Sequence, residues 1–154
     1  MNAVELLTQD HQTVATLFGQ LEATKAQKEK ERLFRQIKAE LETHTHIEET
    51  IFYPALQQAE ELNELILEAF EDHKAAKALL LEIGIQFDGS QNFDAQLNDL
   101  KQIVVRHVRE EEDEVFPQVE ELFVASELER LGKEMQAAKK EFQKTENVAR
   151  SASS

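Results

Sequence analysis

The sequence predicts an all-α protein, an up-down antiparallel four-helix bundle with an additional C-terminal helix. Turn-forming residues are scarce: only four glycines and two prolines occur among 154 residues, too few for a sheet of many short strands. Apolar residues instead recur at alternating steps of three and four, which is the period of a helix packed along a bundle seam. The length suits one compact domain that buries its core without disulfides, and the chain contains no cysteine.

The first predicted helix begins at Asn2, a good N-cap with Glu5 three residues on, and ends near Thr24. A charged connector, residues 25–31, leads to a second helix, which Pro54 should disturb. The first helix has the inner stripe Leu7, His11, Val14, Phe18 and Leu21, and the second has Phe34, Ile37, Leu41, His44, Glu48 and Ile51.

The third predicted helix begins around Glu61, and turn-forming residues at 88–92 make the clearest loop after it. A fourth helix extends to Pro117, and a last helix starts with a capping box formed by Ser126 and Glu129. The third helix carries Ile66, Phe70, His73, Leu80 and Phe87, the fourth carries Leu97, Leu100, Val104, His107, Glu111 and Val115, and the last carries Leu128, Leu131, Met135 and Phe142.

The two halves of the chain repeat each other. Asp10-His11 corresponds to Asp72-His73, and a second histidine follows 33 residues later in the first half and 34 residues later in the second. Each second histidine has a glutamate four positions on, and a proline preceded by an aromatic residue ten positions on. We therefore predict one helical bundle over residues 1–148. It consists of hairpin repeats at about 1–60 and 61–117 and a C-terminal helix at 126–147, followed by a flexible tail at 149–154.

The charge balance and the absent segments narrow the function. The chain has 17 Lys and Arg against 31 Asp and Glu, a net charge of −14, so no basic face could neutralise nucleic-acid phosphates. Its apolar stretches are too short to span a bilayer and its N-terminus has no secretory leader, so we expect a cytoplasmic protein with no membrane partner. Without cysteine, thiolate zinc sites, thiol catalysis and cysteine-bound iron–sulfur clusters are excluded.

Histidines on the predicted inner stripes are the informative departure from a normal bundle core. Each of the four helices places one histidine there, and two helices add a glutamate four residues later on the same face, in the pairs His44–Glu48 and His107–Glu111. A carboxylate on a buried seam costs several kcal/mol unless it is paired or bound to a metal ion. Imidazole suits iron, zinc, copper or nickel, and a carboxylate can bridge two cations.

The number of ligand groups points to two metal ions with open positions. Two octahedral ions need about twelve ligand positions, of which four imidazoles and two bridging carboxylates supply about eight and an oxo or hydroxo bridge about two. The remaining positions are what O₂, peroxide or NO chemistry requires. No catalytic residue is assigned, because the sequence lacks a phosphate-binding loop, a zincin motif, a nucleophile elbow and the Glu-x-x-His pattern of ferritin-like proteins.

With these motifs the sequence resembles the hemerythrin-like HHE cation-binding domains over nearly its whole length. The resemblance implies two non-haem iron ions, oxo- or hydroxo-bridged, with zinc or manganese as alternatives, bound by His11, His44, Glu48, His73, His107 and Glu111. The same pattern occurs in the di-iron domain of the repair-of-iron-centres proteins, which usually carry a cysteine-bearing domain before it, whereas these 154 residues contain no cysteine. Oxygen-carrying hemerythrins have a second histidine four residues after the third-helix histidine. This chain has Lys77 there, which disfavours a simple oxygen carrier.

Several neighbours of these residues allow two interpretations. Lys77 points inward beside the metal ions or, as we favour, lies on the helix flank with its ammonium group in water. Four acidic residues also allow two interpretations, and these are Asp10, Glu49, Asp72 and Glu112. Each of them either orients an imidazole through a hydrogen bond or has no role at the site, in which case the glutamates are solvated and the aspartates form hydrogen bonds between helices. His46 is expected at the surface, and Tyr53 is expected only to pack.

We therefore expect a non-haem di-iron protein that binds or reacts with O₂, peroxide or NO, and that small ligand is its expected partner. Two alternatives remain: an iron-handling protein that buffers, senses or donates iron for iron-centre repair, and a structural metal site. Whether the protein is an enzyme stays open, as does its oligomeric state.

Overall fold

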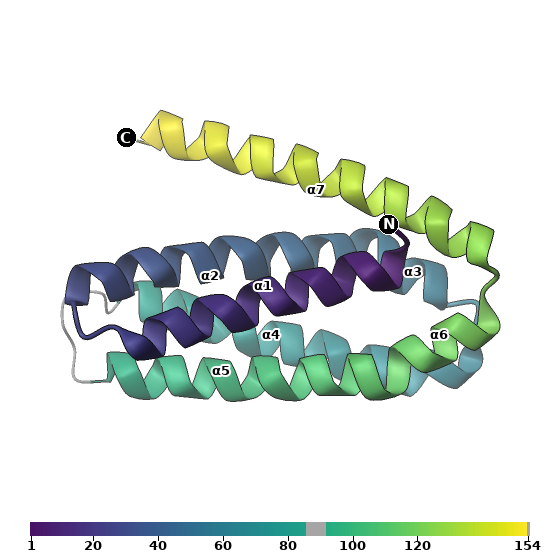
Figure 1. The fold of residues 1–154 in the computed structure, drawn as a ribbon, viewed down its shortest axis with the longest axis horizontal. Helices are drawn as coiled ribbons and strands as arrows, with labels where there is room; N and C mark the ends of the chain where they lie inside the picture. Colours follow the sequence, from purple (N-terminus) through teal and green to yellow (C-terminus); the bar gives the residue numbers. More distant parts are fainter. Residues whose placement is uncertain (86–91, 154) are drawn as a thin grey trace.

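Four long helices form an up-down bundle in the computed structural model, which describes residues 1–85 and 92–153 (Figure 1). These helices are α1 (Ala3–Ala23), α2 (Gln27–Ile47), α4 (Asn63–Ile85) and α5 (Phe93–Glu110). Helix α1 packs chiefly on α2, and α4 packs chiefly on α5. The described residues contain no strand, so the predicted all-α fold is confirmed. Phe87 and most of the predicted loop 88–92 lie outside the described residues.

The starts of the helices show where local sequence signals decide and where they do not. The predicted capping box of α1 is present: the Asn2 side chain accepts from the Glu5 amide at 2.9 Å, and the Glu5 carboxylate accepts from the Asn2 amide at 3.2 Å. The charged connector predicted at 25–31 is wrong, because α2 already begins at Gln27. Its Lys and Glu residues are good helix formers, and their charges stay in water on the helix surface. A 3₁₀ turn, η2 (Glu60–Leu62), leads into α4.

The predicted disturbance at Pro54 takes the form of a π-helix that lies before the proline. Segment η1 (Glu48–Phe52) joins α2 to α3 (Tyr53–Leu56), and η3 (Glu111–Val115) joins α5 to α6 (Phe116–Leu122). Proline lacks an N–H and its ring clashes with the carbonyl four residues earlier, and a wider turn relieves both constraints. The chain therefore stays helical beyond both prolines, and the prediction that the fourth helix ends at Pro117 is wrong.

The C-terminal helix α7 (Ala125–Ser153) is longer than the predicted range 126–147 and includes residues 149–153 of the predicted tail. The predicted capping box is also wrong, because Ser126 lies inside the helix and the Glu127 carboxylate accepts from the Val124 amide instead. In Figure 1, α7 starts at the end of the bundle that holds the N-terminus and diverges from α2 toward its own C-terminus.

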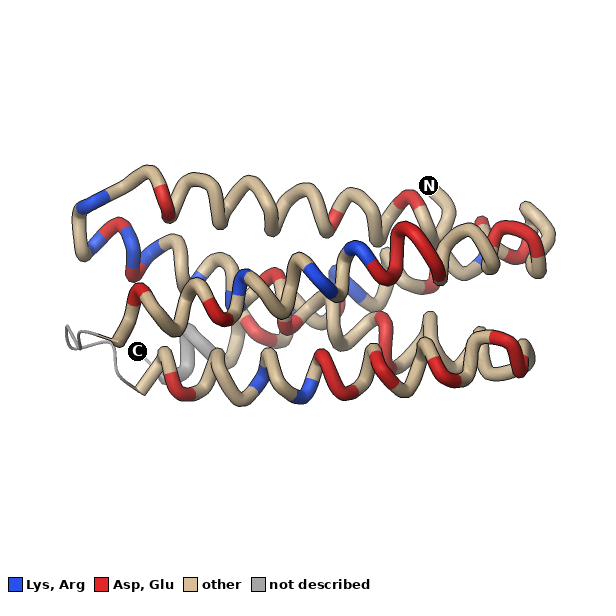
Figure 2. The backbone as a smooth tube through the Cα atoms, turned by 90° about the horizontal axis from the view of Figure 1, so that it is seen from below, with Lys and Arg blue, Asp and Glu red and all other residues tan. Residues whose placement is uncertain are grey.

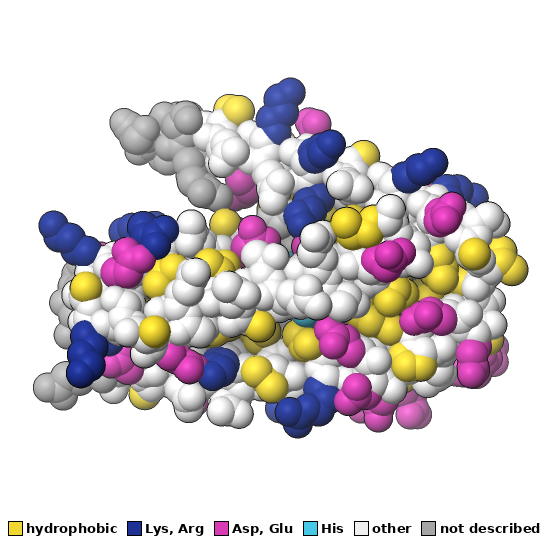
Figure 3. Space-filling view, in the orientation of Figure 1, with side chains coloured by type: hydrophobic (Ala, Val, Ile, Leu, Met, Phe, Trp, Pro, Cys, Tyr) yellow, Lys and Arg dark blue, Asp and Glu magenta, His cyan; other side chains and the backbone are white. Residues whose placement is uncertain are grey.

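Two apolar clusters fill the ends of the bundle, and a layer of buried polar residues separates them. Along α1, α2 and α4 the inner histidine lies between a residue of one cluster and a residue of the other, and after His107 of α5 the other cluster begins with Val115 of η3. On α1, for example, His11 lies between Leu7 and Val14. Almost no histidine surface is visible in the space-filling view of Figure 3, in which apolar side chains gather along the right-hand part of the α7 seam. The imidazoles are thus deep inside the bundle.

Negative charge dominates the outer surface, most clearly at the end of the bundle that holds η3 and α6, on the right in Figure 2. None of the helices in the described part of the chain has an apolar stretch long enough to cross a bilayer.

Candidate metal centre

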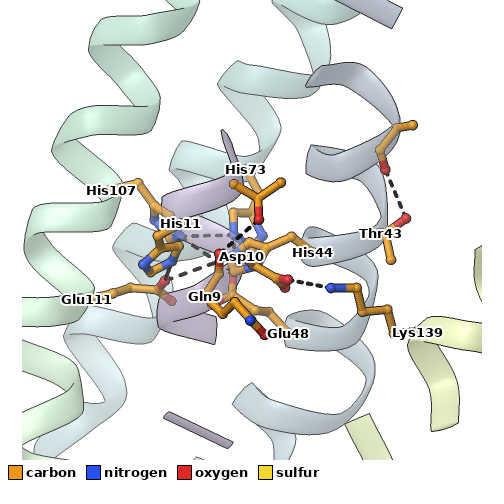
Figure 4. Close-up of polar contacts among 12 residues, drawn as sticks. Gln9, Asp10, His11, Thr43, His44, Glu48, His73, His107, Glu111 and Lys139 are labelled. Carbon is orange, nitrogen blue, oxygen red and sulfur yellow. Dashed lines mark hydrogen bonds and ion pairs between the residues drawn. The ribbon is translucent and has the colours of Figure 1, made fainter. Parts of the chain in front are cut away.

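The central polar layer contains all six residues that the sequence singles out as metal ligands. Each of them is buried, and they converge from the four long helices and the two π-helices (Figure 4). The carboxylates are the most extreme case, because Glu48 is 0% exposed and Glu111 is 1% exposed. An ionised carboxylate without water requires hydrogen-bond donors or cations around it. The layer must therefore hold positive charge.

Four of the six residues form the tightest group. One ligand atom each from His44, Glu48, His107 and Glu111 lies within 4.8 Å of all the others. The two remaining histidines flank this group, since His11 Nε2 lies 3.0 Å from Glu111 Oε1 and His73 Nε2 lies 3.0 Å from Glu48 Oε1. The structure thus brings all six residues together, each with an imidazole Nε2 or a carboxylate oxygen facing the centre.

The other nitrogen of every imidazole faces an acidic side chain at the rim of the layer. The Nδ1 distances to carboxylate oxygens are 2.7 Å for His11–Glu112, 3.0 Å for His44–Asp10, 2.8 Å for His73–Glu49 and 3.6 Å for His107–Asp72. A carboxylate in this place accepts the Nδ1 proton, fixes the ring and leaves the Nε2 lone pair free for a metal ion. Three of these distances are hydrogen bonds, so the geometry favours the interpretation that Glu112, Asp10 and Glu49 orient imidazoles. Asp72 Oδ2 faces His107 Nδ1 from beyond hydrogen-bond distance, and both atoms are buried without a partner.

The π-helices explain how neighbouring glutamates reach the same ring. Glu48 and Glu49 contact the two opposite nitrogens of His73, although successive side chains diverge by about 100° on a regular α-helix. Glu111 and Glu112 contact both nitrogens of His11 in the same way. In each case the glutamates are the first two residues of the π-helix. Widened turns of this kind commonly lie at functional sites, and here they place two consecutive carboxylates on one imidazole.

Burial and charge act against each other on the protonation of this layer. Burial alone lowers the pKa of His44, but the carboxylates of Glu48, Asp10 and Glu111 raise it to about 10. The pKa of His107 likewise lies well above its ordinary value, because Glu111, Asp72 and Glu48 outweigh its burial. Burial raises the pKa of Glu48, yet the surrounding imidazoles and its contact with Glu111 bring it well below its ordinary value. Without a metal ion, protons supply the positive charge.

The donor set fits metal ions. Where Nδ1 donates to a carboxylate, as in His11, His44 and His73, the Nε2 atom of the neutral ring is a hydrogen-bond acceptor. The Nε2 atoms of all four histidines face carboxylate oxygens, and those of His73 and His107 also face each other. His73 Nε2 and His107 Nε2 are 3.3 Å apart, and His44 Nε2 lies 3.2 Å from Glu48 Oε1 without forming a hydrogen bond. Glu48 Oε2 is also buried without a partner. Acceptors that face each other repel unless a cation lies between them, and imidazole with carboxylate is a ligand set for iron and zinc.

Tyr53 is a polar contact of the layer that the sequence reasoning missed. Its hydroxyl donates to Glu111 Oε2 at 2.7 Å, and its ring stacks on His73 with a centroid distance of 5.6 Å. Burial, together with the charges of Glu111 and Glu48, raises the pKa of this phenol well above its ordinary value, so Tyr53 remains a hydrogen-bond donor. The corresponding residue of the second repeat is Phe116, which lacks the hydroxyl, and this difference was readable in the sequence.

Lys139 of α7 is the second missed contact. Its ammonium group lies 2.5 Å from Asp10 Oδ1, and the other oxygen of Asp10 accepts from His44 (Figure 4). A signal was present here too, because residue 139 is four positions after Met135 and three before Phe142, on the inner stripe of the helix.

Lys77 and His46 lie outside the layer. Lys77 is on the flank of α4, as the favoured interpretation predicts, with its side chain 57% exposed and its Nζ 3.5 Å from Glu49 Oε1. His46 is half-buried, and its ring stacks on Phe142 of α7 at a centroid distance of 4.4 Å.

Known proteins are similar to this chain in sequence, and one solved structure is also similar in fold. Residues 2–119 match the family described as the hemerythrin HHE cation binding domain. A crystal structure of a hemerythrin HHE cation binding domain-containing protein from Mycobacterium kansasii is similar, with a TM-score of 0.81 and 26% sequence identity, over 94% of this chain and 89% of that chain. A Nostoc protein named DNA nickase is 27% identical over 143 residues, 93% of this chain, and this chain spans about 40% of the length of that relative.

The family match covers most of the chain and includes every residue of the buried layer, whereas Lys139 at the edge of the layer lies beyond the match. The structural similarity extends over nearly the whole bundle. The chain belongs to the hemerythrin HHE cation-binding domain family.

Proposed function

We propose that this protein binds two iron ions in the central layer, and that the metal centre binds or reacts with a small ligand such as O₂, peroxide or NO. The ligands are His11, His44, Glu48, His73, His107 and Glu111. The observation that carries the proposal is the convergence of four imidazole Nε2 atoms and two buried carboxylates in one layer of an otherwise apolar core. Iron bound there would supply electrons and open coordination positions for such a ligand.

The imidazoles form two pairs. The ring centroids of His11 and His44 are 5.0 Å apart, and those of His73 and His107 are 4.8 Å apart. Each pair combines one histidine from the first helix of a hairpin with one from the second helix. This pairing supports one metal ion at each pair.

The two buried carboxylates reach both pairs. Oε1 of Glu48 lies 3.2 Å from His44 Nε2 and 3.0 Å from His73 Nε2. Oε1 of Glu111 likewise lies within 3.3 Å of one imidazole nitrogen in each pair. A carboxylate in such a position can bridge two cations and offset their charge, which supports Glu48 and Glu111 as the bridging ligands.

An apolar cavity beside the imidazoles favours a small ligand over a purely structural metal site. Its volume is about 40 Å³, and it touches His11, His44, His73 and His107. The rest of its wall combines aliphatic side chains, among them Val14, Leu80 and Val104, with the polar residues Asp10, Glu42, Thr45, Asp72 and Lys77. A volume above about 15 Å³ can hold a water-sized molecule. A diatomic ligand fits this description.

The position of Lys77 supports reaction rather than reversible carriage of O₂. Its ammonium group pairs with Glu49 at the rim of the layer, and a lysine supplies no imidazole, so a metal ion beside His73 gains no fifth imidazole from this position. Mixing the reduced, iron-loaded protein with O₂ should therefore give a lasting oxidised form. An oxygenated species that persists for hours and releases O₂ under vacuum would contradict this expectation.

Metal analysis of the purified protein, together with its visible spectrum, tests the proposal. We expect about two iron ions per chain and the absorption of a bridged ferric pair, whereas zinc is spectroscopically silent. His44→Ala and His107→Ala should each lose metal, and His46→Phe, which removes the imidazole but keeps an aromatic ring against Phe142, should keep full occupancy. One metal ion per chain, or equal loss from the His46 variant, would refute the proposal.

Two further measurements separate the alternative functions. Chelation should lower the melting temperature by roughly 5–10 °C per site, because saturating metal stabilises the folded state by about 2.7 kcal/mol at a hundredfold excess over Kd. Rapid transfer of iron to a weak chelator would favour an iron-handling protein. The name DNA nickase describes a longer relative, and the net charge of −14 gives no support for DNA binding by this chain.

A further inference from the structure

The C-terminal helix delivers one charged side chain to the edge of the metal-binding layer. The inner stripe of α7 is otherwise apolar and includes Leu131, Met135 and Phe142. At the position between the last two stands Lys139, whose side chain is only 25% exposed. An ammonium group so placed loses much of its hydration, which requires a specific partner. That partner is Asp10, whose side chain is 4% exposed.

Tertiary packing holds α7 in the register that this contact needs. Leu131 and Met135 are buried in the apolar cluster at the N-terminal end of α1, and the ring of Phe142 stacks on His46 of α2. Gly132 lies against the backbone of Met1 so closely that an added Cβ would come within 2.3 Å of its carbonyl oxygen. These contacts lie on both sides of Lys139 along the helix. Its ammonium group therefore reaches Asp10 from a fixed position.

The contact continues to a proposed metal ligand. Lys139 Nζ lies 2.5 Å from Asp10 Oδ1, Asp10 Oδ2 lies 3.0 Å from His44 Nδ1, and His44 Nε2 faces the centre. A carboxylate held at one oxygen only can rotate about its side-chain torsions. With both oxygens held, the direction in which Asp10 accepts the His44 proton is set, and the ring plane of His44 is set with it.

The second repeat has the same contact in a weaker form. Arg106 donates to Asp72 Oδ1 at 2.7 Å, but its side chain is 59% exposed. The distance from Asp72 Oδ2 to His107 Nδ1 is 3.6 Å, longer than the corresponding 3.0 Å in the first repeat. The first repeat thus has a tighter support for its second histidine.

We propose that Lys139 is a positioning residue of the metal centre, which orients His44 through Asp10 and makes the metal position at His11 and His44 the tighter of the two. Helix α7, which lies beyond the family match at residues 2–119, is then a functional part of the centre. The proposal rests on the proposed function, because it assumes that His44 binds a metal ion.

The direction in which metal affinity changes when Lys139 is replaced shows whether this residue orients His44 or acts only through its positive charge. A positive charge near two metal cations repels them, so its removal would strengthen metal binding if charge alone mattered. Loss of orientation weakens metal binding instead, by about 10-fold to 100-fold for groups that hold a ligand imidazole. A mere docking contact of α7 would lower the melting temperature of the metal-free protein and leave metal affinity unchanged.

Titration of the full-length, metal-free protein with cobalt(II), followed by visible absorption, measures these outcomes. We expect two equivalents to bind to the wild type, and Lys139→Met to weaken one of the two by about 10-fold. Lys139→Arg should restore most of the affinity, because it keeps the charge and the donors. Lys140→Met is the matched control, since this neighbouring lysine is exposed. Melting curves of all four metal-free proteins show whether the fold is retained.

The failures are distinguishable. If the wild type does not bind two cobalt ions, the proposed function fails and the role of Lys139 fails with it. If the wild type binds two ions, the inference alone is overturned by a Lys139→Met variant that binds both ions as the wild type does or more tightly. It is also overturned by a variant that weakens both ions equally.

Discussion

The two hairpins of the bundle carry the same ligands but surround them differently. In each, an Asp-His pair on the first helix is followed by His and Glu on the second, and a π-helix begins at that Glu. The two adjacent glutamates of each hairpin contact the first histidine of the other hairpin, which is His73 for the first hairpin and His11 for the second. Each aspartate instead lies beside the second histidine of its own hairpin. The two halves thus interlock around the centre, and both are needed to complete either of the two proposed metal positions.

The differences lie one contact away from the ligands. Tyr53 donates a hydrogen bond to Glu111, whereas its counterpart Phe116 only stacks on His11. Asp10 is held by a lysine of α7, whereas Asp72 is held by an exposed arginine of α5. The comparison teaches that the repeat determines which groups face the centre, and that the residues supporting them differ between the two halves.

The largest expected effect is a loss of metal affinity when either proposed bridging carboxylate, Glu48 or Glu111, is replaced. Glu48→Gln and Glu111→Gln should each weaken metal binding at both positions by more than about 100-fold, because an amide neither bridges two cations nor offsets their charge. Isothermal titration with iron(II) under anaerobic conditions measures this, with the exposed Glu114→Gln as the control. Loss at only one position in either variant would contradict the bridging roles.

The second largest expected effect is a pH dependence of the stability of the metal-free protein, which follows from the protonation of its buried histidines. The pKa of His44 is raised from 6.5 to about 10, and that of His107 is also raised. A raised pKa favours the folded state fully at pH values below 6.5, and this stabilisation is lost as the pH rises toward 10. Urea unfolding of the chelated protein should therefore show falling stability between pH 6.5 and 10.

The pH dependence of stability can be divided between the two hairpins by measuring it in a variant of each. His44→Leu and His107→Leu should each remove part of it, since each deletes one imidazole that takes up a proton in the folded state. A stability that rises with pH over this range would show that the imidazoles are not protonated in the metal-free fold.

Tyr53→Phe should remove one of the two differences between the hairpins. The change keeps the ring in its place but removes the donor to Glu111 Oε2, and hydrogen bonds to charged groups contribute about 1.5–3 kcal/mol. We expect the free energy of unfolding of the metal-free protein to fall by about that amount. Denaturant titration measures it, and an unchanged midpoint would mean that the hydroxyl contributes nothing to holding Glu111.

The smallest effect is expected for Arg106→Met, the counterpart of the Lys139 variant. Exposed ion pairs contribute about 0.2–1 kcal/mol, and the Arg106 side chain is 59% exposed. The variant should change metal affinity by less than about fivefold, which corresponds to 1 kcal/mol at most. An effect on cobalt binding as large as that of Lys139→Met would remove the proposed difference between the two halves.

The fold was largely predictable, because its signals are local or periodic. The capping box at Asn2, the scarcity of Gly and Pro and the three-four spacing of apolar residues all act over a few turns of helix. The helix boundaries that were predicted wrongly lie where contacts beyond the local sequence determine whether the helix continues. Pro54 and Pro117 read locally as helix ends, but packing of the aromatic residues beside them keeps the chain helical through a π turn.

The sequence by itself determined which six groups face the centre. Charged and imidazole side chains on an apolar stripe cannot be explained by core packing, and the internal repeat doubles the signal. Only the tertiary structure decided which supporting residue touches which ligand. Glu49 and Glu112 act on histidines of the opposite hairpin, and Lys139 acts on Asp10 across 129 positions of sequence. Such contacts depend on how whole helices dock, and helix docking follows from the packing of the complete core rather than from any local pattern.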